Sequence, residues 1–388
     1  MGGYKMQGPR GTRTEEIQNV IHLIDQVFRI DRGLPPSMGE QFPLLLREEN
    51  KDRMRIIVDQ NQPVAAVNYY KSHLLIQGTK IPVASVGSVC THPDYQGKGI
   101  ATALLDDVEE KMRQEDILLM LVSGRRNMYR RRHCSISGDF YKATFFPKAK
   151  KAEVELIPYS PEYLDDIRRL YYAEGLRYER DYEEFIGFFQ GGTRDWGKLT
   201  YQVCLMKEKG EVSGYFVLGI SKEIDHRWGK IREYAGDRDQ IVAGCYEVLD
   251  QHDLSFITLH FSTGDPIKYA MMRQKVQMEK ENQVGTLKIL QFTKLMDQLR
   301  SYFSKYVPKT LLDRLIYGEE GERYFLGVGD DKIWFKNLDE VNQFIFGVNY
   351  QEPIPTYKWD FKEQPLLQEF YQTVFPIPIP WAECLNYI

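Results

Sequence analysis

The stretch that decides the fold is Val86–Leu105, which reads VGSVCTHPDYQGKGIATALL. Apolar residues at Val86 and Val89 predict a strand, and Thr91–Tyr95 is typical of a turn. Beyond Gly99, apolar side chains recur every three or four residues, which predicts the buried face of a helix. These side chains are Ile100, Ala103, Leu104, Val108 and Met112. The stretch is therefore predicted to run from a strand through a glycine-rich turn into a helix.

The glycine-rich turn Gln96–Ala101 is suited to binding an anion. Backbone N–H groups in the first turn of a helix have no intrahelical acceptor, and the helix dipole adds partial positive charge there. Glycine lets the backbone approach a ligand closely, so we expect a phosphate or pyrophosphate. A Walker A loop would need glycine at His92 and Ser or Thr at Gly99, so it is excluded. A dinucleotide loop would need glycine at Thr102 and a later acidic residue, but Ile117–Val122 is apolar throughout.

Gln96, Gly99 and Ala101 instead form the pattern Gln-x-x-Gly-x-Gly/Ala. Following a strand and a His-Pro-Asp-Tyr turn, this pattern resembles the pyrophosphate loop of the GNAT superfamily of N-acetyltransferases. The alternative is a glycine turn before an ordinary helix. The resemblance implies that acetyl-CoA binds the loop and the backbone of the strand before it. The implied binding residues are Val89, Cys90, Thr91, Gln96, Gly97, Lys98, Gly99, Ile100, Ala101 and Thr102.

The order of expected elements divides the chain into three parts and predicts a mixed α+β fold. Residues 1–150 read as a helix, antiparallel strands and a strand–helix–strand crossover, which is the order of a GNAT domain. Residues 151–288 repeat that order, so we expect a second GNAT-like domain. Residues 289–388 change to helices, a hairpin and a proline-rich tail.

The second part is expected not to bind CoA. Its turn before the crossover helix, Ala235–Gln240, lacks the glycine pattern and carries Asp237 and Asp239 where phosphates would lie. Two carboxylates at that point repel a pyrophosphate.

Three local predictions concern shorter segments. Short helices are expected at Phe42–Leu46 and Lys309–Tyr317, and Pro147–Lys151 is a charged hinge between the first two parts.

The whole arrangement resembles the Eis (enhanced intracellular survival) family, which has two GNAT-like domains and a small third domain. The resemblance implies a sterol-carrier-protein-like fold for the third domain and acetylation of amines such as aminoglycosides, polyamines or lysine side chains. It also implies that the end of the chain enters the first active site. Apolar residues up to Ile388 agree with a buried end, since free termini are commonly polar. Relatives form homo-oligomers, so a homo-oligomer is one state that the resemblance implies.

Acetyl transfer to an amine requires donors for the oxyanion and an acid for the leaving thiolate. Tyr129 matches the tyrosine of the GNAT pattern and is the predicted acid, a core tyrosine being the alternative. The Gly-Phe pair that follows in that pattern is replaced here by His133-Cys134, which leaves the turn geometry open. The backbone N–H groups of Val89–Thr91 are the candidate oxyanion donors.

The base is not apparent on the strand before the loop, because Val86–Ser88 contains no basic group. The resemblance points instead to the α-carboxylate of Ile388, which would bind and orient the amine. The alternative is a tail that packs only for stability. His92 is expected to be a turn residue rather than a base.

Two further features have plain explanations. Cys90, on a predicted buried strand, is expected to be an inert core residue and not an acyl carrier. The arginines within Arg125–Arg132 are expected on a solvated face, the alternative being that Arg125 or Arg126 contacts the CoA phosphates.

Composition limits the function classes. The net charge of −4 gives no overall attraction to nucleic acid or anionic membranes, and no apolar leader or spanning segment is visible. The five cysteines are scattered without metal-ligand spacing, so neither a zinc site nor a disulfide scaffold is expected. We predict a cytoplasmic N-acetyltransferase without a metal. The competing hypotheses are a non-catalytic CoA-binding regulator and a carrier of a hydrophobic ligand.

Overall fold

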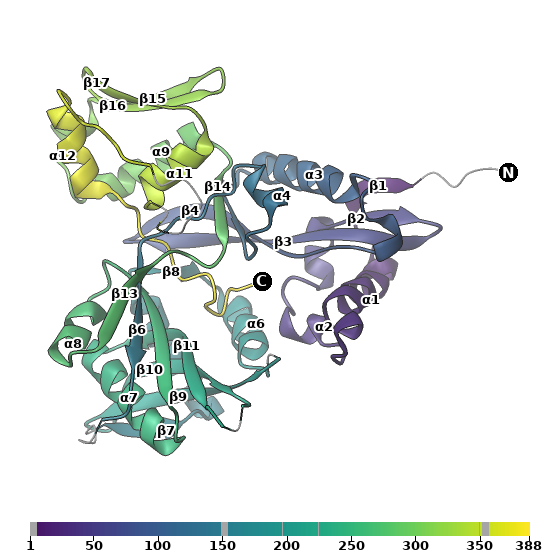
Figure 1. Ribbon diagram of the computed structural model, residues 1–388, viewed down its shortest axis with the longest axis vertical. Helices are drawn as coiled ribbons and strands as arrows, with labels where there is room; N and C mark the ends of the chain where they lie inside the picture. Colours follow the sequence, from purple (N-terminus) through teal and green to yellow (C-terminus); the bar gives the residue numbers. More distant parts are fainter. Residues whose placement is uncertain (1–5, 149–153, 196, 224, 349, 351–356) are drawn as a thin grey trace.

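The computed structural model describes residues 6–148, 154–195, 197–223, 225–348, 350 and 357–388. Two seven-stranded sheets and one three-stranded sheet, with helices packed on them, make a mixed α+β structure. The fold class predicted from the sequence is therefore confirmed. Figure 1 shows the first sheet across the middle of the molecule, the second sheet below it and the third unit above. In the described residues, no helix has both the length and the apolar composition needed to span a bilayer.

The first sheet has the order β1-β2-β3-β4-β5-β14, and β8 pairs with the far end of β3. Its strands are β1 (Gln7–Gly11), β2 (Met54–Asp59), β3 (Gln62–Ile76), β4 (Thr79–Thr91), β5 (Leu119–Val122), β8 (Leu176–Glu179) and β14 (Thr286–Ile289). Among the described pairs of this sheet, β4 with β5 is the parallel one. Helix α3 (Ile100–Gln114) makes the crossover that parallel pairing requires.

Helices cover both faces of the first sheet because side chains alternate along its strands. On β3, Ala66 lies in the core cluster that contains helix α1 (Ile17–Phe28). Its neighbour Val67 lies in the cluster that contains α3. The anion loop and α3 are thus on one face, and α1 is on the other.

The second sheet has the order β13-β6-β12-β11-β10-β9-β7. Its strands are β6 (Phe140–Phe145), β7 (Glu155–Pro158), β9 (Leu199–Glu208), β10 (Glu211–Ser221), β11 (Trp228–Gly236), β12 (Phe256–Ser262) and β13 (Gln277–Glu281). The helices of this part are α5 (Leu164–Ala173), α6 (Tyr182–Gly192), α7 (Arg238–Gln251) and α8 (Ile267–Arg273). β11 and β12 run parallel around α7, which repeats the β4–α3–β5 arrangement of the first sheet.

The two larger sheets exchange strands. β6 follows β5 of the first sheet in sequence, yet it pairs with β12 and β13 in the second sheet. β14 follows β13 in sequence, yet it pairs antiparallel with β5 in the first sheet. The chain therefore passes from the first sheet to the second at β6, before residue 150, and returns to the first sheet at β14 (Figure 1). The domain limits expected at residues 150 and 288 stay a prediction.

In the part of it that the structure describes, the third unit consists of a three-stranded antiparallel sheet and four helices. Its elements are α9 (Phe292–Phe303), α10 (Lys309–Leu312), β15 (Leu315–Glu320), β16 (Arg323–Val328), β17 (Asp331–Phe335), α11 (Leu338–Phe346) and α12 (Pro365–Val374). Its core continues into the first sheet through Leu74, Ile76 and Leu287. The likeness of this unit to sterol carrier proteins stays a prediction.

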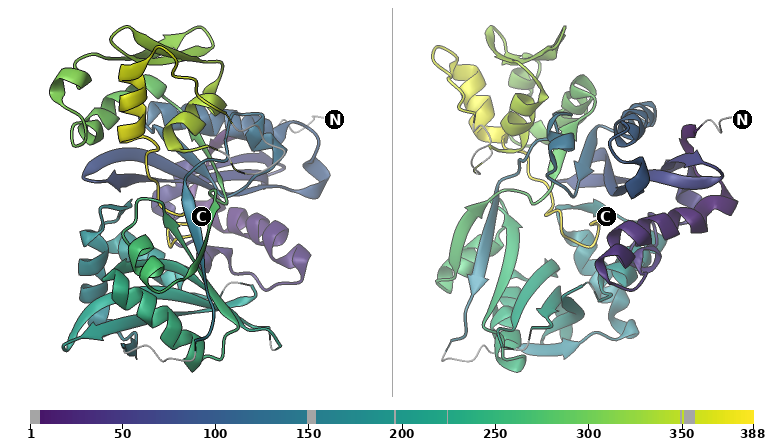
Figure 2. Two further views of the ribbon diagram at one scale, coloured as in Figure 1. Left: turned by 60° about the vertical axis from the view of Figure 1, so that its left-hand side comes forward. Right: turned by 45° about the vertical axis from the view of Figure 1, so that its right-hand side comes forward.

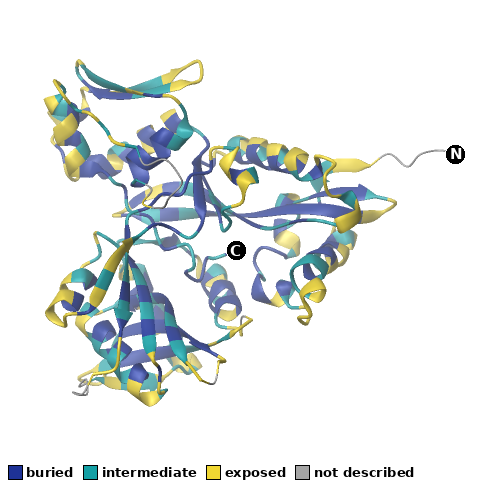
Figure 3. Ribbon diagram, viewed as in Figure 1, coloured by how far each residue is buried: buried dark blue, intermediate teal, exposed yellow. Residues whose placement is uncertain are grey.

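The tail after α12, Phe375–Ile388, leaves the third unit and ends between the two larger sheets in all views (Figures 1 and 2). Most of its last eight residues are buried and the rest are half-buried, so the chain end is covered as the sequence suggests (Figure 3).

Two short helices expected from the sequence are wrong in position. The helix expected at Phe42–Leu46 is replaced by α2 (Met38–Gln41), since Pro43 has no N–H and disfavours helical geometry in the residue before it. In Lys309–Tyr317 the helix ends at Leu312, because the later residues pair with β16 instead. Part of the hinge Pro147–Lys151 lies outside the described residues.

Candidate active site

The anion loop opens to solvent at the start of α3. Gly97 and Gly99 have φ angles of +75° and +76°, a left-handed conformation that glycine adopts without strain. A Cβ added to either glycine would meet no atom within 4 Å, so the space before these residues is free of protein. Gly99 is the N-cap of α3 and brings no side-chain acceptor, which leaves the first amides of the helix for a ligand.

The side chains of the loop residues hold its shape. The Gln96 Nε2 atom donates to the Thr91 carbonyl (3.2 Å), and the Lys98 Nζ atom donates to the Asp94 carbonyl (2.9 Å). His92 caps the short turn before the loop by accepting a hydrogen bond from the Asp94 amide (3.4 Å). This contact is that of a turn residue.

β4 and β5 separate beyond Val86, the last β4 residue that pairs with β5 in the described sheet. Ser88 has a φ angle of +52°, and the register between β3 and β4 shifts at this point. The bulge bends the end of β4 away from its neighbour. Val89–Thr91, the predicted binding backbone, thus lies beyond the point of separation. Cys90 is buried opposite Ala66, and burial raises the pKa of its thiol to about 12, so it is neutral.

Tyr129 lies on α4 (Asn127–Arg130), packed in the cluster that contains Val86 and α3. Burial raises the pKa of its phenol to about 12, although the nearby Arg126 acts in the opposite direction. A Cβ on Gly124 would lie 2.9 Å from the Tyr129 ring, so glycine at this position makes room for the tyrosine.

Two arginines fix the segment that carries Tyr129. Arg132 donates to Glu109 (3.0 Å) and to the Thr102 carbonyl (2.9 Å), which ties the segment to α3. Arg125 donates from Nε to the Val284 carbonyl (2.5 Å) beside β14. Arg125 is therefore bound to protein backbone, while Arg126 is exposed.

The chain end lies against β4 on the opposite face of the sheet from Tyr129. A Cβ on Gly87 would lie 2.3 Å from Cγ2 of Ile388 and 2.9 Å from its carboxyl carbon. Ile388 is only 7% exposed. Tyr387 and Ile388 also line a narrow cavity of about 40 Å³ with Val86 and Val122. The predicted acid and the predicted carboxylate thus both pack near Val86–Gly87 of β4, but on opposite faces of the sheet.

A buried amide that the sequence did not single out lies at the same point. Asn68 pairs in register with Gly87 and is fully buried. Its Nδ2 atom donates to the Ser88 carbonyl (3.4 Å), whereas its Oδ1 atom has no hydrogen-bond partner within the described part of the chain. The site therefore contains a buried acceptor that can receive an N–H group.

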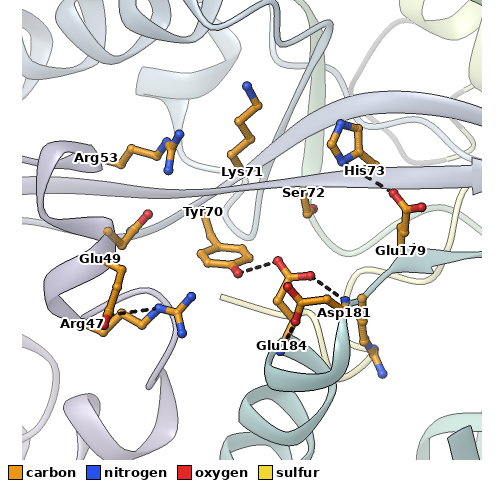
Figure 4. A pocket seen from close by; sticks show the side chains of 12 residues that line it. Arg47, Glu49, Arg53, Tyr70, Lys71, Ser72, His73, Glu179, Asp181 and Glu184 are labelled. Carbon is orange, nitrogen blue, oxygen red and sulfur yellow. Dashed lines mark hydrogen bonds and ion pairs between the residues drawn. The ribbon is translucent and has the colours of Figure 1, made fainter.

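A groove of about 500 Å³ lies on the α1 side of the first sheet, between β3, the 47–53 segment and the start of α6 (Figure 4). The Tyr70 hydroxyl donates to Glu184 (2.6 Å), and the Tyr70 ring contacts Phe188 edge-on with 5.5 Å between ring centroids. Phe188 and Ile388 in turn line the next recess, so the groove adjoins the chain end.

The groove is lined by equal numbers of acidic side chains and of lysine or arginine side chains, and most of these charges are paired. Arg53 is bound to Glu115, and Lys80 holds Glu179. Asp181 and Glu184 cap α6, and no ion pair joins either of them to a described residue.

The second crossover helix has its N-terminus occupied by carboxylates of the protein. Asp237 caps α7 by accepting from the Gln240 amide (2.9 Å), and Asp239 is paired with Arg273. Glu174 accepts from the Gly236 amide (3.0 Å). This arrangement leaves little room for a phosphate at the start of α7.

The comparisons with known proteins agree with this geometry. Residues 9–137 match the sequence model of the acetyltransferase (GNAT) domain family. No curated protein matches the chain. In the described residues, no cluster of side chains could hold a metal ion.

Solved structures with the same fold include three bacterial proteins. A GCN5-related N-acetyltransferase from Anabaena variabilis has a TM-score of 0.64 at 14% identity, over 99% of this chain and 100% of that one. A probable N-acyltransferase from Enterococcus faecalis has a TM-score of 0.63 at 13% identity, over 97% and 99%. Eis1 from Mycobacterium abscessus has a TM-score of 0.58 at 14% identity, over 89% and 90%. At these identities the likeness is one of fold, and it extends over nearly the whole chain.

Proposed function

We propose that this protein is an N-acetyltransferase that transfers an acetyl group from acetyl-CoA directly to a primary amine. Its residues 9–137 match the sequence model of the acetyltransferase (GNAT) domain family. The observation that carries the proposal is the contact between Ile388 and Gly87, at the point where β4 and β5 separate. A carboxylate there can reach an amine that enters between the two sheets.

The residues present fit acetyl-CoA. The amides around Gly97–Ala101 face open space and would hold the pyrophosphate, and the free edge of Val89–Thr91 would bind the pantetheine arm. When bound, acetyl-CoA supplies an acetyl group activated as a thioester. The N–H groups of the same β4 edge would stabilise the oxyanion that forms during attack.

Tyr129 would stabilise the leaving sulfur by donating a hydrogen bond. Its pKa of about 12 keeps the hydroxyl protonated at neutral pH. An ordinary thiol has a pKa of roughly 8.5, so complete proton transfer from Tyr129 to the thiolate is uphill. We therefore assign Tyr129 the role of hydrogen-bond donor, with solvent supplying the final proton.

The carboxylate of Ile388 would bind the incoming amine and orient it toward the thioester. Its charge attracts an ammonium group, and it accepts an N–H once the amine has lost a proton. The Asn68 Oδ1 atom is a second acceptor at the same point. Two acceptors define the direction of the nitrogen lone pair better than one.

The groove beside the chain end supports an acceptor that carries positive charge. Asp181 and Glu184 lie near Tyr70 without a cationic partner among the described residues. An aminoglycoside, a polyamine or a lysine-like amine would supply that partner. We further propose a homo-oligomer as the working form.

The test is an acetyl-transfer screen across amine classes, with release of free CoA thiol as the readout. We expect turnover with polycationic amines, and a strong loss when Tyr387 and Ile388 are deleted. Adding one alanine after Ile388 moves the terminal charge by one residue and should have a similar effect. Full activity of both altered chains would show that Ile388 has no part in the mechanism. Absence of transfer to every amine tested would refute the proposed function.

A further inference from the structure

A buried ion pair joins the second sheet to the tail of the chain. Arg180 lies between β8 and α6, and its side chain is 0% exposed. Its Nη1 and Nη2 atoms donate to the two carboxylate oxygens of Glu233 on β11, at 3.1 and 2.6 Å. Its Nε atom donates to Oδ1 of Asn386 in the tail (2.7 Å). We name these three residues the tail clasp.

Both charged residues of the tail clasp make further contacts besides the ion pair. Glu233 also accepts from the Tyr215 hydroxyl (3.1 Å) and from the Leu385 amide (3.4 Å). The Arg180 guanidinium lies 4.2 Å from the centroid of the Tyr171 ring. A buried charge pair with this many partners tolerates little displacement, because each lost contact leaves a charge without compensation.

The clasp contacts the tail two residues before its end. Two residues span at most about 7 Å of extended chain, so fixing Asn386 confines Ile388 to the neighbourhood of Gly87. Asn386 itself is 3% exposed. The pair of Lys230 with Glu383, farther upstream, contacts a half-exposed part of the tail instead.

The residue type at position 386 fits this task. Asparagine offers an oxygen acceptor to Arg180 without adding charge. The arginine and Glu233 already balance each other, so a charged residue at position 386 would upset the balance next to the terminal carboxylate.

We propose that Arg180 is a positioning residue, which acts through Asn386 to hold the terminal carboxylate of Ile388 at the point where β4 and β5 separate. This inference rests on the proposed function for its catalytic consequence. The placement of Ile388 itself can be tested without any activity.

The experiment compares Asn386→Leu, which keeps size and removes the acceptor, with Asn386→Gln, which keeps an uncharged oxygen acceptor on a side chain one methylene longer. Glu383→Ala is the matched control, since it removes a half-exposed tail contact outside the clasp. For each full-length chain we measure release of the C-terminal isoleucine by a carboxypeptidase, the kcat of acetyl transfer, the acetyl-CoA Kd and the melting temperature. If Asn386→Leu does not fold, Asn386→Ala takes its place.

We expect Asn386→Leu to release Ile388 at least tenfold faster and to lower kcat at least tenfold, with the acetyl-CoA Kd within twofold. Asn386→Gln should retain more of the protection than Asn386→Leu, and Glu383→Ala should match the unmodified chain in both assays. Unchanged release in Asn386→Leu, or equal release in Asn386→Leu and Glu383→Ala, would overturn the clasp whatever the activity. Faster release with unchanged kcat would keep the clasp and refute the catalytic use of the carboxylate. An unmodified chain without transfer would refute the proposed function alone.

Discussion

Replacing Gly87 by alanine tests the placement of the chain end most directly. The added Cβ would lie 2.3 Å from Cγ2 of Ile388 and 2.9 Å from its carboxyl carbon. Contacts below 3.0 Å essentially never occur, and ordinary van der Waals contact begins at 3.4 Å. Ile388 must therefore move by about 1 Å or more. Gly87 lies outside the left-handed region, so alanine itself fits the strand backbone.

The expected cost follows from this displacement. A misplacement of 1 Å at a reacting centre lowers the rate by roughly 100-fold, which is about 2.7 kcal/mol in the activation barrier. We expect Gly87→Ala to lower kcat by that factor and to leave the acetyl-CoA Kd within twofold, because the added methyl group points toward Ile388, on the opposite face of β4 from α3. The assay is thiol release at saturating acetyl-CoA, with the melting temperature and the Kd measured in parallel.

Two controls separate the position of Ile388 from a general effect of the substitution. Gly264→Ala adds a methyl group where no atom lies within 4 Å, and it should change nothing. Deleting Ile388 in the Gly87→Ala chain should cause little further loss, since both changes act on the same carboxylate. A Gly87→Ala chain with the kcat of the unmodified protein would refute the reasoning.

Four further predictions concern the donor side and the core. Tyr129→Phe should lower kcat by one to two orders of magnitude with unchanged acetyl-CoA affinity by calorimetry; equal kcat would leave Tyr129 a core residue. The pKa of Tyr129 is about 12 in the folded chain and near 10 in the unfolded chain. Tyr129 therefore contributes stability below pH 10 that is lost as the pH rises toward 12. The free energy of unfolding of Tyr129→Phe, measured in urea, should accordingly decrease less steeply over this range than that of the unmodified chain. Gly99→Val should weaken acetyl-CoA binding at least tenfold, and unchanged affinity would place the pyrophosphate elsewhere. Cys90→Ala should keep kcat within twofold. Loss of all turnover with an intact fold would instead support a mechanism with a covalent acyl-cysteine intermediate at Cys90.

The anion loop could be predicted from the sequence because its signal is local. A strand, a glycine turn at Gln96–Gly99 and a periodic apolar helix face follow one another within about twenty residues, and the structure retains each of them. The mixed α+β class followed from the same kind of pattern.

The acceptor side could not be predicted in the same way, because its contacts join distant segments. Nothing near Gly87 indicates that the last residue of the chain packs against it. Arg180 reads as one charge among many at a helix start, and only its buried partners reveal its role. Glu233 gave no clearer signal, because β11 also carries Lys230 and Arg232 and only the structure shows that Glu233 is buried.

The exchange of β6 and β14 bears on how the protein can be divided in the laboratory. A fragment that stops at residue 150 would retain β6 without its neighbours β12 and β13, and its β5 edge would lack β14. Such a fragment exposes two unpaired strand edges, which favour aggregation. The two larger units should therefore unfold together in a single transition. Separate expression of residues 1–150 should yield insoluble protein unless residues 286–289 are restored to it and β6 is left out.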